Sequence, residues 1–539
     1  MTLIVQSAAG YDKLQTQMSG LGTVVAMPQW YINFNLANLL AHGQTTDGKS
    51  LQNVQLVNGQ HTFLTGVIAR IWTQVYVPGS AQKVKFILSF KSGTLDYWDI
   101  DQDPPVKKQA DITGLQYGFD VDLNRSDVQD NQNLPAPVKQ RVLDLLSNLG
   151  QGAFTVQQLF MDFENATLSQ YDPSATIFPS NFPDSAATAF SDYLRTYLKG
   201  LSGAGGNILG YAIRVHNPGG KDDPVATFPP TDLQFATNRY TPSQSPGPND
   251  WRPDLDTIDY QMMTGGGTFP TNLPVWSGNF VVPADDASGW YGAIAMAQQL
   301  FVQQFLLPRL SPLVTQYWRL KDRSGSLDIN YDTATGALIS HGLGGAWNSG
   351  QTSGHSHQTN TWSNDDAYYN MTFDVQVNIT PGSNQIVIQR NTNFDIEFVH
   401  WYGVEGGAAK SRFKVWYAVP LTITVTLQGV QDGNLVVAVA SQTTQPDPNI
   451  GYGDPYGWLI TQTDGDSSIW QSVSKTMDAM INSAVNAAMP EALLPGITQV
   501  ITKDLNLSPF VFPGGAQLFM ANPMFNNEGD LLLGLQYKR

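Results

Sequence analysis

The stretch Leu115-Gln-Tyr-Gly-Phe-Asp-Val-Asp-Leu-Asn124 decides the fold class, because apolar and polar residues alternate along it. A period of two places the apolar side chains on one face of a β-strand and the polar ones on the other. Such strands are typical of antiparallel sheets that contact water on one side. The same alternation recurs at residues 84–90, 371–379, 421–427 and 531–537. The longest of these segments favour extended, bent sheets over a small sandwich.

Two long segments with apolar residues at helical spacing interrupt the strands. The first is expected to begin at Trp290, and Pro308 should end or kink it. Its apolar residues are Ile294, Ala297, Phe301 and Phe305. The second helix is expected over residues 467–489, after Asp466 and Ser467 as caps. Its apolar residues include Ile469, Val473, Met477 and Ile481.

Other local signals complete the expected element order. Shorter helices are expected at residues 11–19, 136–149 and 186–199. Eight prolines in residues 217–255 should break any regular element there, and the Gly-, Ser- and Thr-rich residues 344–366 are expected to form a long loop. Asp432-Gly433 lies between two apolar runs and predicts a hairpin turn.

These elements predict an α+β fold with long curved antiparallel sheets wrapped around amphipathic helices. The C-terminal half is expected to contain a helix, at least four long strands, a second helix and a final strand, and a single sheet around both helices would bury all the apolar faces together. The length of 539 residues favours two large modules. We place them at residues 1–280 and 281–539, with the Pro-rich segment 217–255 as a connection.

Composition excludes several classes of protein. Charged residues make up only 14% of the chain while 25 Phe, 21 Tyr and 13 Trp are present, so the chain is not disordered. The formal net charge of -16 makes nucleic acid an unfavourable partner, because nucleic-acid affinity comes mainly from basic side chains. Anionic membranes are disfavoured for the same reason, unless a local basic patch such as Lys410, Arg412 and Lys414 dominates.

The absence of cysteine excludes disulfides, thiol nucleophiles and thiolate zinc sites. The N-terminus has no basic region followed by a long apolar run, so we expect no signal peptide. No apolar run approaches the length of about 18 residues that a transmembrane helix needs. The compartment stays open, either cytoplasmic or reached by a non-classical export route.

Catalytic and metal-binding patterns are weak throughout. There is no Gly-x-Ser-x-Gly motif, and Asp99-Ile-Asp101-Gln-Asp103 is followed by Pro104 where a calcium loop needs glycine. His355-Ser-His357 lacks zinc-site spacing. Asp162 and Glu164 would share one strand face as a glycosidase pair does, but the same alternation fits a solvated face. We therefore predict a protein that is not an enzyme and has no cofactor or metal.

The element order resembles that of the tubular lipid-binding (TULIP) superfamily. The segments that carry the resemblance are Ala226-Thr-Phe-Pro-Pro-Thr-Asp-Leu-Gln-Phe235, Thr257-Ile-Asp-Tyr-Gln-Met-Met-Thr264, Phe269-Pro270 and Trp276. Within the superfamily, the chain is similar to the OrfX-type accessory proteins of clostridial neurotoxin clusters. The resemblance implies non-enzymatic binding of a lipid or other elongated hydrophobic ligand, and an accessory role beside a bacterial toxin with a protein partner.

The predicted ligand site is an apolar tube in the C-terminal module. Deformable methionines on the helices would suit varied chains. The predicted lining residues are Ile294, Phe301, Phe305, Phe373, Val375, Val473, Met477 and Ile481. Two alternatives remain open. The same fold could have a closed core and serve as a protein–protein interaction scaffold, or the aromatic β-surface could belong to a carbohydrate-binding or carbohydrate-active protein.

Overall fold

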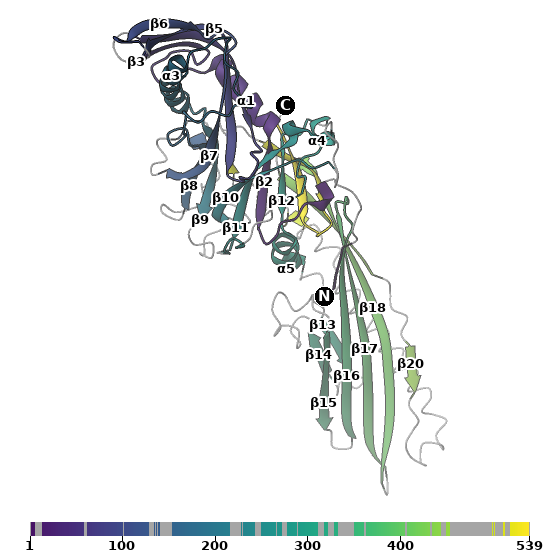
Figure 1. Ribbon diagram of the computed structural model, residues 1–539. Coiled ribbons are helices and arrows are strands. Elements are labelled where there is room, and N and C mark those ends of the chain that lie inside the picture. Colours follow the sequence, from purple (N-terminus) through teal and green to yellow (C-terminus); the bar gives the residue numbers. More distant parts are fainter. Residues whose placement is uncertain are drawn as a thin grey trace. The chain divides into compact units, whose positions relative to one another are not determined.

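The computed structural model contains helices together with long, mainly antiparallel sheets (Figure 1). It describes residues 2–5, 13–58, 62–100, 102–128, 134, 136, 138–140, 154–215, 228, 230–242, 250–265, 267–271, 278–287, 289–310, 317–321, 328–332, 350–359, 363–404, 407–431, 434–443, 449–452, 498–499, 501, 510–511 and 518–537. The sheets are curved and the helices pack on them, so the predicted α+β fold class is confirmed.

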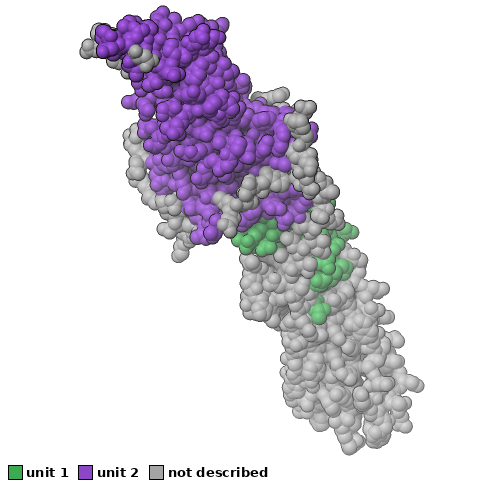
Figure 2. Space-filling model, in the orientation of Figure 1, with its two compact units in different colours: residues 1–7, 298–429, 435–504 green, residues 8–297, 430–434, 505–539 purple. Residues whose placement is uncertain are grey.

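The chain forms two compact units, each built from segments that are distant in the sequence (Figure 2). Unit 1 consists of residues 1–7, 298–429 and 435–504, and unit 2 consists of residues 8–297, 430–434 and 505–539. The last strands of the chain therefore belong with most of the N-terminal half. These units are bounded at other residues than the predicted modules 1–280 and 281–539, whose TULIP-like character stays a prediction.

Unit 2 contains a long antiparallel sheet, sheet I, with the strand order β21, β9, β8, β7, β5, β4, β3 and with β6 paired to β5. Its strands are β3 (Asn53–Asn58), β4 (Thr62–Gln74), β5 (Lys83–Asp99), β6 (Val106–Asp111), β7 (Gln116–Val128), β8 (Phe154–Met161), β9 (Ile208–Val215) and β21 (Phe510–Val511). The alternating segments predicted at 84–90 and 115–124 pair with each other, with Phe86 opposite Phe119, which confirms both.

Helix α3 (Asp184–Gly203) covers sheet I and confirms the helix predicted at 186–199. Its apolar stripe is buried, and the Phe190 ring lies 5.1 Å from the ring of Tyr117 on β7. Tyr197 is also buried and donates a hydrogen bond to the carbonyl oxygen of Leu51 at 3.2 Å. The helix is thus held by both apolar contacts and a satisfied buried hydroxyl.

Helix α1 (Gln29–His42) packs against β4 and was not predicted. Asparagines interrupt its apolar pattern, so its hydrophobic periodicity is weak. One of them is structural, because the Asn33 side-chain oxygen accepts a hydrogen bond from the backbone N–H of Thr73 at 2.7 Å. A polar contact therefore holds the helix on the sheet, and the pattern of hydrophobic residues in the sequence could not predict it.

A second sheet of unit 2, sheet II, has the strand order β10, β11, β2, β12, β23, β22. Its strands are β2 (Thr23–Pro28), β10 (Pro230–Asn238), β11 (Thr257–Thr264), β12 (Gly292–Met296), β22 (Leu518–Phe525) and β23 (Leu531–Tyr537). All residues of β2 and β12 are buried, so this sheet is covered on both faces at its centre. The strand predicted at 531–537 is confirmed as β23.

Residues 14–16 are joined to the C-terminal hairpin of sheet II. Asn526, in the turn between β22 and β23, is fully buried and donates to the carbonyl oxygen of Thr16 at 3.0 Å. The N–H of Asn527 donates to the carbonyl oxygen of Leu14 at 2.8 Å. These bonds explain why the described part of the helix predicted at 11–19, residues 13–19, forms only one 3₁₀ turn, Lys13–Gln15: the carbonyl groups bond the C-terminal hairpin instead.

The long helix predicted from Trp290 is also wrong in its first half. Residues Gly292–Met296 form β12, which hydrogen-bonds to β2 on one side and to β23 on the other. A short, wholly buried apolar run fits either a helix or a central strand. Here the segment forms a strand, because it pairs with a neighbouring strand on each side. Helical structure begins only at Gln299–Leu306, in π geometry, and continues as α5 (Leu307–Leu310), which contains Pro308.

Two segments predicted to be irregular contain strands. Pro230 is the first residue of β10, an edge strand of sheet II, where a missing N–H is tolerated. Part of the expected loop 344–366 is β15 (Gly350–Thr359), which pairs antiparallel with β16 (Ser363–Ile379). Backbone hydrogen bonding along a long neighbour stabilises this polar strand without an apolar face.

Unit 1 contains a sheet with the strand order β1, β16, β17, β18, β19, in which β15 pairs with β16 and β20 with β18. Besides β15 and β16, its strands are β1 (Thr2–Val5), β17 (Gln385–Val404), β18 (Gly407–Gln431), β19 (Asn434–Thr443) and β20 (Asn449–Tyr452). A separate hairpin joins β13 (Tyr317–Lys321) to β14 (Asp328–Asp332). The strands predicted at 371–379 and 421–427 are confirmed, with Val377 and Ile423 buried. The helix predicted at 467–489 and the Asp432-Gly433 turn lie outside the described residues.

Candidate functional site

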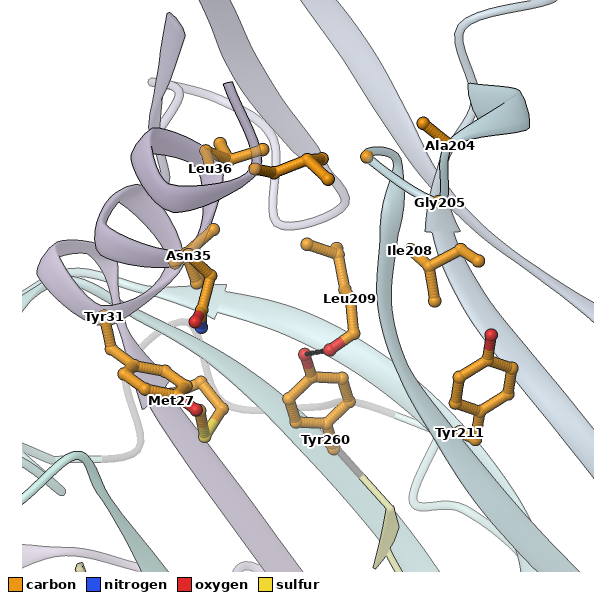
Figure 3. A pocket seen from close by; sticks show the side chains of 13 residues that line it. Met27, Tyr31, Asn35, Leu36, Ala204, Gly205, Ile208, Leu209, Tyr211 and Tyr260 are labelled. Carbon is orange, nitrogen blue, oxygen red and sulfur yellow. Dashed lines mark hydrogen bonds between the residues drawn. The ribbon is translucent and has the colours of Figure 1, made fainter. Parts of the chain in front are cut away.

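The candidate site is a cavity of about 370 Å³ inside unit 2 (Figure 3). It lies between α1, the end of α3 and the strands β2, β9 and β11. The described residues that line it are Met27, Tyr31, Ile32, Asn35, Leu36, Leu39, Ala204, Gly205, Gly206, Ile208, Leu209, Tyr211 and Tyr260. The lining is mostly apolar, which is typical of pockets for small organic ligands.

One side of the cavity is formed where β2 continues into α1. Pro28 is extended at the helix N-terminus, with φ -74° and ψ 150°, and fixes the direction in which the helix leaves the strand. Tyr31, Asn35 and Leu39 follow one another at a spacing of four residues, so they lie on the same face of the helix. That face is the one that borders the cavity.

The opposite side is formed by the turn that ends α3. Gly205 has a φ of +78°, its N–H donates to Ser202 O at 2.9 Å, and the N–H of Gly206 donates to Leu201 O at 2.8 Å. This is the Schellman arrangement, which requires the left-handed region at Gly205. A Cβ on Gly206 would lie 2.4 Å from Leu201 and 2.8 Å from Leu39, so only glycine lets the turn approach α1 this closely.

Four polar side chains contribute to the lining: Tyr31, Asn35, Tyr211 and Tyr260. The Tyr260 hydroxyl donates to the carbonyl oxygen of Leu209 at 3.1 Å, and burial raises the pKa of Tyr260. Burial likewise raises the pKa of Tyr211 to about 12, so its hydroxyl is protonated at neutral pH. Within the described part of the chain, neither the Tyr211 hydroxyl nor the Asn35 amide has a hydrogen-bond partner. Figure 3 shows these two groups on opposite sides of the cavity.

Of the two carboxylates considered as a glycosidase pair, Asp162 has a structural role. Strand β8 ends at Met161, so Asp162 and Glu164 do not share a strand face. Asp162 accepts hydrogen bonds from the side chains of Asn165 and Asn124 at 2.7 and 3.2 Å. Burial alone would raise the pKa of Asp162, but these hydrogen bonds outweigh burial and lower it. Among the described residues, no three His, Asp or Glu side chains are grouped as metal ligands.

The predicted ligand-lining residues are distributed over both units. Ile294 lies on β12, Phe301 and Phe305 stack at 6.0 Å in the π-helical turn, and Val375 is buried on β16. Phe373 also lies on β16, whereas Val473, Met477 and Ile481 are outside the described residues. None of the eight lines the cavity of Figure 3, and they stay a prediction.

Sequence reasoning missed the residues that do line the cavity. One signal is present in Gly203-Ala-Gly-Gly-Asn-Ile208, whose glycines favour a turn, but the position of that turn beside α1 is not encoded locally. The apolar residues of β11, Thr257–Thr264, are in the segment that resembles the TULIP superfamily, and Tyr260 is among them.

Comparisons with known proteins give likenesses of structure alone. No protein-family profile and no curated protein matches the sequence. P47 from Clostridium botulinum A2 is similar with a TM-score of 0.47 and 11% identity, over 98% of this chain and 99% of that one. P47 of Clostridium botulinum E1 has a TM-score of 0.47 and 8% identity, over 96% and 100% of the two chains. A lipopolysaccharide binding protein has a TM-score of 0.32 and 8% identity over the same shares.

Within the described residues, no helix combines the length and the apolar character needed to cross a membrane.

Proposed function

We propose that this protein binds a lipid or another elongated hydrophobic ligand, without catalysis, in the cavity of unit 2. The observation that carries the proposal is the mostly apolar space of about 370 Å³ between α1, the end of α3 and the strands β2, β9 and β11. Lining residues such as Asn35 and Leu39 are only half-buried, so the space is partly open, and leaving its apolar walls in contact with water costs free energy. An apolar ligand would fill the space and remove that cost.

The two polar groups without partners indicate an amphipathic ligand. Asn35 offers an amide that donates and accepts, and Tyr211 offers a protonated hydroxyl. In a mostly apolar pocket, a few such groups orient the ligand. A single acyl chain that ends in a carboxylate or an ester fits this arrangement, because its apolar part contacts the leucines while its polar end meets Tyr211 or Asn35.

Filling the cavity should prevent binding. Leu39→Trp replaces a leucine by a larger, aromatic side chain at a half-buried position that borders the cavity. We expect affinity for a dansyl-labelled fatty acid, followed by fluorescence titration, to fall by at least about tenfold, or about 1.4 kcal/mol. The matched control is Ala37→Trp, which adds the same ring at an exposed position of the same helix and should leave affinity unchanged.

Thermal unfolding of the same variants separates this function from a closed scaffold. If the space is a ligand site, Leu39→Trp should keep the melting temperature of the wild-type protein. If the core is closed, the larger ring would overpack it at a cost of about 1–3 kcal/mol. A destabilised Leu39→Trp protein, together with a wild-type protein that takes up no labelled fatty acid, would favour the protein-interaction scaffold.

Tyr211→Phe tests the orientation of the ligand. Removing the hydroxyl should weaken oleate binding by at least about tenfold, because a hydrogen bond to a charged carboxylate contributes about 1.5–3 kcal/mol. Binding of a long-chain alkene should not change, because it has no polar end. Isothermal titration calorimetry measures both, and equal losses for the two ligands would show that the hydroxyl does not contact a polar end.

The accessory role beside a bacterial toxin is also part of the proposal, and it rests on the sequence resemblance. Under that role, the protein binds a partner encoded next to it. Co-purification with the products of its neighbouring genes is the test, and recovery of the lipid-loaded protein alone from such co-expression would contradict it.

A further inference from the structure

Exposed apolar side chains gather at the tips of two neighbouring hairpins of sheet I. The described residues expose eight large apolar side chains, and five of them are on the β3–β4 and β5–β6 hairpins. They are Val57, Phe63, Trp98, Ile100 and Val106, with exposed fractions of 55%, 45%, 48%, 71% and 42%. Such a concentration marks an interaction surface, whereas single exposed apolar residues do not.

Strand pairing brings these side chains together. Val57 on β3 lies opposite Phe63 on β4, and Trp98 on β5 lies opposite Lys107 on β6. The Lys107 ammonium lies 5.8 Å from the centre of the Phe63 ring, which connects the two hairpins. Figure 1 shows β3, β5 and β6 at the same end of sheet I. We call Val57, Phe63, Trp98, Ile100 and Val106 the apolar tip.

The apolar tip extends beyond the core that the hairpins share. Leu64, Leu95 and Tyr97 are buried beneath it, with exposed fractions of 1%, 0% and 4%. Along β5, Trp98 points to the face opposite Tyr97, whereas Val106 pairs with Asp99 on the face of Tyr97. Exposed apolar groups therefore lie on both faces of the hairpin ends, an arrangement that suits contact with a fluid layer.

Charges beside the apolar tip are mixed. Lys107 pairs with Asp96 at 2.9 Å and Lys108 pairs with Asp99 at 2.6 Å, and all four side chains are near Trp98 along β5 and β6. A zwitterionic headgroup complements such a surface, since its phosphate faces lysines while its choline faces carboxylates and aromatic rings. An anionic surface would meet the carboxylates and the net charge of -16.

We propose that the apolar tip docks unit 2 on a phosphatidylcholine bilayer, with Trp98, Phe63 and Ile100 at the headgroup level, because the aspartates on either side of Ile100 keep it out of the acyl region. Trp is enriched at membrane interfaces because its ring is amphipathic, and lysine ammonium groups remain in water while their stems lie along apolar surface. The inference is independent of the cavity, and it gives the protein a route to a lipid surface that needs no transmembrane helix.

Flotation with phosphatidylcholine vesicles tests the proposal. The wild-type protein should float with the vesicles, and Trp98→Ser with Ile100→Ser should lower the partition coefficient by at least about tenfold, because the largest side chain of the tip and its most exposed one are lost. Phe34→Ser with Ile177→Ser is the matched control, since both residues are exposed, apolar and outside the tip. The control should bind vesicles as the wild-type protein does.

Each other result would overturn the proposal. Equal vesicle binding by the two double variants, or no flotation of the wild-type protein, would show that the apolar tip does not bind the bilayer. Binding confined to anionic vesicles would contradict the headgroup argument. A tip-dependent dimer in sedimentation without flotation would identify a protein contact instead. Leu39→Trp should still float, and loss of flotation in that variant would assign vesicle binding to the cavity.

Discussion

Replacing Lys13 by alanine is expected to lower the free energy of unfolding by about 3–5 kcal/mol, the usual cost of removing one partner of a buried ion pair. The Lys13 ammonium lies 2.6 Å from Asp285 and 4.4 Å from the centre of the Trp290 ring, and the two charged side chains are only 11% and 5% exposed. Without Lys13, the Asp285 carboxylate would stay buried with its charge uncompensated. Urea denaturation of the full chain measures the loss.

Two controls separate this pair from an ordinary surface charge. Lys49→Ala removes a lysine whose pair with Asp47 is well exposed, at 66% and 57%, and should leave the urea midpoint unchanged. Lys13→Met combined with Asp285→Asn removes both charges and should recover most of the loss. If Lys13→Ala is as stable as Lys49→Ala, the pair does not hold the N-terminal segment on unit 2.

The second large effect concerns pH. Asp256 and Asp259, just before and within β11, are 6% and 1% exposed, and burial raises the pKa of each to about 7. Between about pH 4 and pH 7 the two carboxyl groups stay protonated in the folded protein but lose their protons in the unfolded chain. The free energy of unfolding therefore falls as pH rises through this range. For each group, the pKa differs by about three units between the unfolded chain and the folded protein, which corresponds to a change of roughly 4 kcal/mol in the free energy of unfolding.

Asp259→Asn should remove the part of the pH dependence of stability that comes from the Asp259 carboxyl group. Thr257 donates to the Asp259 carboxyl at 2.6 Å, and the amide oxygen of asparagine can accept the same bond. Relative to wild type, the variant should therefore gain stability between pH 5 and pH 8, as measured by urea denaturation at each pH. Asp256→Asn should have the same effect. In the wild-type protein the Asp256 carboxyl accepts a hydrogen bond from the backbone N–H of Tyr240 at 2.9 Å, and the amide oxygen of asparagine can accept the same bond. A stability difference that is constant with pH would refute the assignment.

The fold could be predicted where one face of an element is apolar and the other polar. Strands β5 and β7 and helix α3 carry that pattern and were identified correctly. Strand β12 is buried on both faces, so its five residues carry no period and were mistaken for the start of a helix. Strand β15 has no apolar face at all, because pairing with β16 provides its hydrogen bonds.

The candidate site could not be predicted in the same way. Its lining comes from residues 27–39, from residues 204–211 and from Tyr260, segments that only the tertiary fold brings together. The close approach of Gly206 to Leu39 depends on the crossing of α3 and α1, which no local pattern encodes. The sequence favoured an apolar ligand from composition and resemblance, but it placed the lining residues on other elements.

Native mass spectrometry of the full chain mixed with equimolar oleate tests the central claim most directly. We expect one added oleate mass on the wild-type protein and on Ala37→Trp, and none on Leu39→Trp, with all three proteins folded. Wild-type protein without an oleate adduct, or an adduct of equal abundance on Leu39→Trp, would contradict a ligand in the cavity of unit 2.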